Sequence, residues 1–96
     1  MRTAARTDAN QKAIVSALRQ IGCSVQPLHM VGKGCPDILV GYRGLNILLE
    51  IKDGSKPPSK RKLTPDEITF FEKWRGQVRV CESVQEAIDI IAEETL

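Results

Sequence analysis

Three ionisable side chains, Asp37, Glu50 and Lys52, stand at the ends of otherwise apolar segments of this sequence. Two carboxylates held close together repel each other unless one is protonated or a cation lies between them. Carboxylate oxygens, a backbone carbonyl and water suit Mg²⁺ or Mn²⁺ rather than zinc. A lysine beside such a site can position or deprotonate a water, or stabilise charge on a phosphate. The three side chains are therefore candidates for metal-assisted phosphate chemistry.

A β-hairpin is expected to bring these side chains together, because two short β-branched runs flank residues 41–44. With the turn centred in the middle of that link, Asp37 lies opposite Leu48 and diagonal to Glu50, at about 7–8 Å. Glu50 and Lys52 are two residues apart and point to the same face. A second interpretation stays open, in which Asp37 only caps a turn and Glu50 only pairs with Lys52.

The motifs around the hairpin resemble those of a known nuclease superfamily. Pro-Asp at 36–37 and Glu-Ile-Lys at 50–52 are similar to the core of the PD-(D/E)xK, restriction-endonuclease-like nucleases. Gly-Cys-Pro-Asp-Ile-Leu-Val-Gly over 34–41 and Leu-Thr-Pro-Asp over 63–66 resemble, more closely, the stand-alone virus-type replication-repair nuclease (VRR-NUC) domains. The resemblance runs over nearly the whole chain.

This resemblance implies a metal-dependent DNA endonuclease that hydrolyses phosphodiester bonds, with Mg²⁺ or Mn²⁺ as its cofactor. It makes Asp37 and Glu50 metal ligands together with the carbonyl of Ile51. Lys52 would steer the attacking water or stabilise the developing negative charge. Small stand-alone members of the family are thought to cut branched DNA as homodimers, like Holliday-junction resolvases. Branched DNA and a second copy of the chain are therefore the expected partners.

Two positions depart from the family pattern. Related nucleases often have a metal-binding glutamate in the first helix, where this chain has the neutral Gln11. We expect Gln11 to support the site or the fold, so that two carboxylates suffice or Asp8 helps. Related nucleases commonly have glutamine at position 67, where Glu67 can lend charge to the site, although a capping box with Thr64 also explains it. A DNA-binding module without turnover is the alternative function that Gln11 leaves open.

The remaining elements follow from periodicity and capping residues. We predict a helix over 7–21, a strand over 23–29, a helix from Thr64 to Gly76, a strand over 77–81 and a last helix capped by Ser83. With the hairpin, the order is αβββαβα, an α/β fold whose mixed four-stranded sheet is flanked by helices. That order agrees with a restriction-endonuclease-like core.

Apolar spacing also predicts which helical residues face the core. In the first helix the expected stripe is Ile14, Val15, Ala17, Leu18 and Ile21. In the helix after Thr64 the expected inward residues are Ile68, Phe71 and Trp74.

Basic residues cluster in two loops near the predicted site. The first loop is rich in glycine, precedes the hairpin and carries Lys33. The second is a Pro- and Ser-rich stretch after Lys52 that carries Lys56, Lys60, Arg61 and Lys62. We expect these residues to contact a DNA backbone. Alternatively, the second loop is a solvated linker. No aromatic residues interleave its cations, so base stacking is not indicated.

Length and composition bound the remaining possibilities. The 96 residues fit a single domain over 1–96. A net charge of +2 is too small by itself to establish a nucleic-acid partner. Three widely spaced cysteines favour neither a disulfide scaffold nor a zinc ribbon. With no apolar leader and no membrane-length apolar run, we expect a soluble protein in the cytoplasm of a bacterium or phage-infected cell, without a membrane partner.

Overall fold

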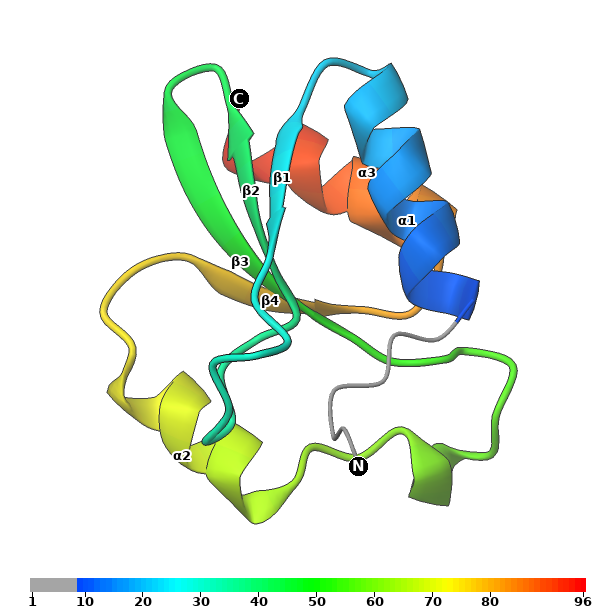
Figure 1. Ribbon diagram of the computed structural model, residues 1–96, viewed down its shortest axis with the longest axis vertical. Helices are drawn as coiled ribbons and strands as arrows, with labels where there is room; N and C mark the ends of the chain where they lie inside the picture. Colours follow the sequence, from blue (N-terminus) through cyan, green and yellow to red (C-terminus); the bar gives the residue numbers. More distant parts are fainter. Residues whose placement is uncertain (1–8) are drawn as a thin grey trace.

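The computed structural model describes residues 9–96, which form a four-stranded sheet with helices beside it (Figure 1). In chain order the elements are α1 (Ala9–Gln20), β1 (Ser24–Pro27), β2 (Ile38–Tyr42), β3 (Leu45–Ile51), the 3₁₀ helix η1 (Pro58–Lys60), α2 (Pro65–Lys73), β4 (Val78–Cys81) and α3 (Val84–Glu94). The predicted order of helices and strands is confirmed, with η1 as an addition. The expected contribution of Asp8 lies outside the described residues.

The sheet is mixed, as predicted, with strand order β1-β2-β3-β4. β1 pairs with β2, and β2 with β3, in antiparallel fashion, whereas β3 and β4 are parallel. A parallel pair needs a crossover connection between its strands. The chain between β3 and β4 supplies it, and this connection contains η1 and α2.

The hairpin turn lies one residue later than the sequence suggested. The two turn residues, 43–44, have φ of 50° and 81°, the positive values of a type I′ turn, whose twist matches that of the flanking strands. The register is therefore shifted by two residues, and Leu48 pairs with Leu39 rather than lying opposite Asp37. Continuing the observed register by one pair places Asp37 directly opposite Glu50.

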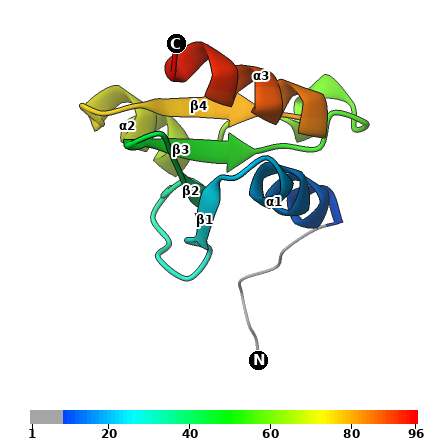
Figure 2. The ribbon, with the colours of Figure 1, turned by 90° about the horizontal axis from the view of Figure 1, so that it is seen from above.

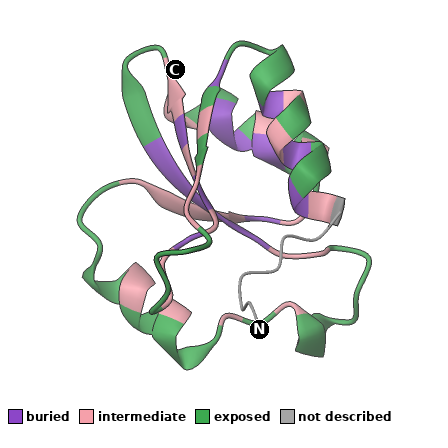
Figure 3. Ribbon diagram, viewed as in Figure 1, coloured by how far each residue is buried: buried purple, intermediate pink, exposed green. Residues whose placement is uncertain are grey.

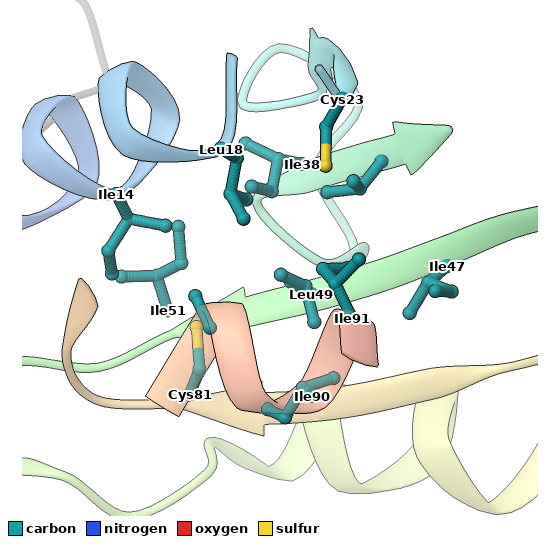
Figure 4. Close-up of a cluster of buried hydrophobic side chains, with 12 residues drawn as sticks. Ile14, Leu18, Cys23, Ile38, Ile47, Leu49, Ile51, Cys81, Ile90 and Ile91 are labelled. Atoms are coloured by element: carbon teal, nitrogen blue, oxygen red, sulfur yellow. The ribbon is translucent and has the colours of Figure 1, made fainter. Parts of the chain in front are cut away.

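The hydrophobic core lies between one face of the sheet and the two helices α1 and α3 (Figures 3 and 4). The strands contribute Ile38, Val40, Ile47, Leu49 and Ile51, and the helices contribute Ile14, Leu18, Ala87, Ile90 and Ile91. The prediction for the first helix is confirmed at Ile14 and Leu18. It is wrong at Ile21, which is 42% exposed because α1 ends at Gln20 and the chain turns away.

The inward packing expected for α2 is wrong. No residue of this helix is buried, and Ile68 is 45% exposed. Trp74 lies just beyond the helix, is equally exposed and stacks on Phe70 with ring centroids 5.2 Å apart. Figures 1 and 2 show α2 apart from α1 and α3. Helical spacing predicts that a helix has an apolar side, but not that the chain itself covers that side.

The N-terminus of α2 is fixed instead by local contacts. Thr64 and Glu67 form the predicted capping box. Gly34, in the loop before β2, has φ of +79°, and a Cβ atom added there would overlap the backbone carbonyl of Asp66. This close approach anchors the loop against the first turn of α2. No helix within residues 9–96 combines the length and the apolar character needed to cross a bilayer.

We expect Gly34→Ala to destabilise the protein more than Gly32→Ala. Both positions have positive φ, which costs a non-glycine residue about 1–2 kcal/mol. Only at position 34 must backbone atoms also move, because nothing lies within 4 Å of a Cβ at Gly32. Urea unfolding of both variants measures the difference. Equal losses of stability would show that the loop does not depend on this contact.

Candidate active site

Asp37, Glu50 and Lys52 lie on the face of the sheet opposite to the core. Side chains alternate between the two faces of a strand, and Ile38 and Ile51 point into the core. Their neighbours Asp37, Glu50 and Lys52 must therefore point to the other face. The structure thus brings the three predicted residues to one place, at the ends of β2 and β3.

The side chain of Asp37 accepts a backbone hydrogen bond at the point where the hydrogen-bond ladder between β2 and β3 ends. Its Oδ2 accepts a hydrogen bond of 2.7 Å from the backbone N–H of Ile51. The continued register would place Pro36 opposite Ile51, and proline has no N–H to offer a partner strand. The N–H and C=O of one strand residue point to the same side. The carbonyl of Ile51 therefore faces the side on which Asp37 lies, as the predicted ligand set requires.

Glu50 is the most unusual ionisable group in the site. It is only 3% exposed, and its Oε1 is buried without a hydrogen-bond partner among the described residues. Burial, together with the charge of neighbouring Asp37, raises the pKa of Glu50 to about 9. Burial also raises the pKa of Asp37, although the hydrogen bond from Ile51 opposes this. Without a bound metal ion, the pair of Asp37 and Glu50 is stable only when it holds a proton.

Lys52 lies between two carboxylates. Its Nζ is 2.8 Å from Oε1 of Glu67 and 3.5 Å from Oε2 of Glu50. Burial alone lowers the pKa of Lys52, but the hydrogen bond to Glu67 and the charge of Glu50 outweigh it and raise the pKa above its usual value. Lys52 is therefore a fixed cation at neutral pH.

Glu67 makes both of the contacts that the sequence offered as alternatives. The same Oε1 that binds Lys52 accepts a hydrogen bond of 2.9 Å from the backbone N–H of Thr64. Burial favours a raised pKa for Glu67, but the hydrogen bonds from Lys52 and Thr64 lower it below its usual value. The capping box of α2 thus also holds the charged partner of Lys52.

The first turn of α1 reaches the same end of β3. Gln11 is buried, 6% exposed, in this turn. The adjacent Asn10 donates a hydrogen bond of 2.8 Å from Nδ2 to the carbonyl of Lys52. Sequence reasoning did not single out Asn10. Its only signal there was its place beside Gln11 in the helix where related nucleases carry an acid.

The donor set suits a hard divalent cation. Within residues 9–96, no group of three or more His, Cys, Asp and Glu side chains could hold a metal ion. Mg²⁺, however, is commonly bound by one or two carboxylates, with water and substrate phosphate completing its shell. The unpartnered oxygen of Glu50 and the repulsion between Glu50 and Asp37 both fit such an ion.

The cysteines do not contribute a nucleophile or a bridge. All three are free thiols. Cys35 adjoins the acidic pair, and burial and then the charges of Glu50 and Asp37 raise its pKa. A thiol with a raised pKa is a poor nucleophile at neutral pH.

The basic residues predicted to contact DNA divide into two groups. Four lysines are exposed and form no ion pair with another described residue: Lys33, Lys56, Lys60 and Lys62. Arg61 is instead engaged within the fold, 3.0 Å from Glu82 and hydrogen-bonded to the carbonyl of Lys56. Arg61 therefore holds the loop that carries the lysines.

We expect Glu50 to make the metal-free protein less stable as the pH rises. Between its ordinary pKa of 4.5 and its folded-state value of about 9, the folded protein keeps a proton that the unfolded chain has lost. Stability is therefore lost as the pH rises through this window. Glu50→Gln should remove this loss and, near pH 9 in EDTA, exceed the parent by more than about 1.4 kcal/mol, the equivalent of one pKa unit.

Urea unfolding in EDTA, near pH 5 and near pH 9, measures this effect. The matched control is Glu72→Gln, a change at an exposed glutamate of α2. It should leave the difference between the two pH values as it is in the parent. A parent protein with the same free energy of unfolding near pH 9 as near pH 5 would contradict the raised pKa of Glu50.

Comparison with known proteins agrees with this description of the fold. No family model matches the sequence, and no curated protein matches it. A solved structure described as a "VRR_NUC domain" superposes with a TM-score of 0.64 at 26% sequence identity, covering 85% of this chain and 89% of that chain. The resemblance seen in the motifs at 36–37 and 50–52 therefore extends to the fold. This likeness supports a VRR-NUC domain with a restriction-endonuclease-like fold.

Proposed function

We propose that this protein is a divalent-metal-dependent nuclease that hydrolyses phosphodiester bonds in DNA. The observation that carries the proposal is the pair of half-buried Asp37 and buried Glu50, with an unpartnered carboxylate oxygen on Glu50 and the protonated Lys52 next to it. Such a pair is costly for the fold alone, because two neighbouring carboxylates out of water repel each other unless they share a proton or a cation. The likeness to a solved VRR_NUC domain supports a nuclease in particular.

Asp37, Glu50 and the carbonyl of Ile51 would hold the ion, Mg²⁺ or Mn²⁺. When bound, such an ion supplies Lewis-acid activation of a phosphate group and of a water nucleophile. The hydrogen bond from the N–H of Ile51 orients Asp37 before any ion arrives. Asn10, by holding the carbonyl of Lys52, fixes the backbone on which Glu50 and Ile51 stand.

Lys52 acts as a fixed positive charge next to the reacting phosphate. Its raised pKa supports a role in stabilising the negative charge of the transition state rather than in removing a proton from water. Glu67 is a positioning residue, because its carboxylate holds the ammonium group and is itself held by the start of α2. Gln11 is a supporting residue in the first turn of α1.

The DNA backbone would pass the loops beside the site. Lys33, Lys56, Lys60 and Lys62 would contact phosphates, and Arg61 would keep the second loop in place. These contacts attract DNA of any sequence, because phosphates carry no sequence information.

Branched DNA and a homodimer are the finer form of this proposal. Cutting two strands symmetrically requires two centres related by a two-fold axis. The exposed apolar side of α2, with Ile68 and Trp74, supports a second copy as the partner that covers it. Single large apolar residues on a surface are common, but an entire helix without a buried residue is not explained by this chain alone.

A DNA-binding module without turnover is the second candidate. The neutral Gln11, where related nucleases often carry an acid, favours it. This reading expects DNA binding with no cleavage in Mg²⁺ or Mn²⁺ on duplex, flap, splayed or four-way DNA. Cleavage of any of these substrates excludes it.

We expect Lys52→Ala and Asp37→Ala to reduce cleavage at least about 100-fold, the scale of losing one transition-state contact. They should differ in metal binding. Lys52→Ala keeps both acids and should keep the rise in melting temperature caused by Mn²⁺, whereas Asp37→Ala should lose it. Gel cleavage assays and thermal shifts with and without EDTA measure both effects.

The control is Lys73→Ala, a change at an exposed lysine at the end of α2. This variant should cleave DNA like the parent. Parent-like cleavage by Asp37→Ala or Lys52→Ala would refute the assignment of the site. Parent cleavage that survives EDTA would refute the metal requirement.

We expect light scattering at micromolar concentration to give twice the mass of one chain. Ile68→Glu should shift the protein to the monomer and reduce cutting of four-way DNA more than binding of Mn²⁺. The charge is placed where a second copy would cover the surface. Lys73→Gln, five residues after Ile68 and so on a different side of α2, should remain dimeric. A monomeric parent would remove the dimer from the proposal and leave the chemistry at Asp37 and Glu50 unaffected.

A further inference from the structure

A groove of about 550 Å³ lies between α1 and the end of β1. Figure 1 shows these two elements side by side. The residues that line the groove include Gln11, Lys12, Val15, Arg19, Pro27 and His29. The volume is in the range of natural ligand sites. The metal site described above does not account for it.

The walls of the groove are cationic and its floor is apolar. Lys12 and Arg19 extend from the exposed side of α1, His29 also lines the groove, and within residues 9–96 no acidic residue lines it. Val15 and Pro27 supply apolar surface. The guanidinium of Arg19 is held in place by a hydrogen bond of 3.1 Å from Nη2 to the carbonyl of Val25. Because arginine has five N–H donors, others remain for a ligand.

Two hydrogen bonds connect the groove to the candidate active site. On one wall, Asn10, next to Gln11, donates to the carbonyl of Lys52 at 2.8 Å. On the other wall, the backbone N–H of Leu28, between the two lining residues of that loop, donates to the carbonyl of Asp37 at 2.8 Å. Both walls of the groove are therefore anchored to the strand ends that carry Asp37 and Lys52.

We propose that this groove binds the backbone of one DNA strand next to the phosphate that is cut. The inference rests on the proposed nuclease function and adds a second contact surface to it. Lys12 and Arg19 would each neutralise a phosphate, and the deoxyriboses would lie on Val15 and Pro27. Cationic walls with no acid among the described lining residues match a polyanion, and the hydrogen bonds to the backbone of Lys52 and Asp37 hold these walls in place relative to the active site.

The test is the salt dependence of DNA binding. Fluorescence anisotropy with a labelled four-way junction in EDTA measures binding without cleavage. In Lys12→Gln/Arg19→Gln, the slope of log K against log salt should become shallower by about 1.4–1.8, because each lost phosphate contact removes about 0.7–0.9. The Kd at low salt should rise about tenfold. Glutamine keeps the helix propensity of these positions.

The matched control removes two cations from elsewhere. Arg43→Gln/Lys73→Gln changes the hairpin turn and the end of α2, so the net charge falls equally. Its slope should stay within about 0.3 of the parent, since distant charges are screened. Melting curves check folding, and the single change Lys12→Gln, at an exposed helix position, should make the slope shallower by about 0.7–0.9.

The outcomes separate this inference from the nuclease proposal. A parent-like slope for both groove variants would overturn the groove, even if the parent cleaves DNA. An equal change in the control pair would overturn it as well, because the effect would then be one of net charge. A shallower slope confined to the groove variants supports the groove, even if the parent cleaves no substrate.

Discussion

The unfavourable contact between two carboxyl groups, half-buried Asp37 and buried Glu50, is the constraint on which the rest of this structure depends. The fold does not relieve that contact by itself, since one oxygen of Glu50 has no hydrogen-bond partner among the described residues. The hairpin register, the N–H of Ile51 and the missing N–H of Pro36 place the two groups together. The core on the opposite face keeps both strands rigid. Burial that costs stability and is held this firmly is typical of a functional site.

A chain of charged and capping contacts connects this pair to α2. Lys52 is held by Glu67, and Glu67 is held by the first turn of α2, so a local capping motif positions a charged group of the site. α2 itself contributes no buried residue. The helix is therefore fixed through its N-terminus, at Gly34 and the capping box, while Ile68 and the following Trp74 remain exposed. This division is consistent with a helix that serves both the site and a second surface.

Much of this arrangement could be predicted from the sequence, because it depends on local rules. The strand ends at Asp37 and Glu50, the cap at Thr64 and the order of elements all follow from periodicity and capping chemistry. The register was predicted wrongly, because the predicted turn was centred on Tyr42 and Arg43. The turn instead takes Arg43 and Gly44, so that a glycine occupies one of the two positive-φ positions. A register shift of two residues keeps each side chain on the same face of the sheet. The predicted proximity of Asp37, Glu50 and Lys52 is therefore unchanged.

Other features depended on contacts between distant parts of the chain. The pairing of Arg61 with Glu82 and the contact of Asn10 with Lys52 have no local signal. The exposure of α2 is of the same kind, because apolar spacing is equally compatible with a core inside the chain and with a surface outside it. The groove beside α1 likewise forms only when that helix packs next to β1.

The most direct measurement is a titration of the metal-free protein with Mn²⁺, followed by electron paramagnetic resonance, in the parent and in Glu50→Gln. The account predicts saturable binding by the parent and a loss of at least about tenfold in affinity in the variant, because one ligand charge is removed while the side chain keeps its shape. Absence of binding by the parent, or equal binding by the two proteins, would contradict the claim that Asp37 and Glu50 are held together to share a cation.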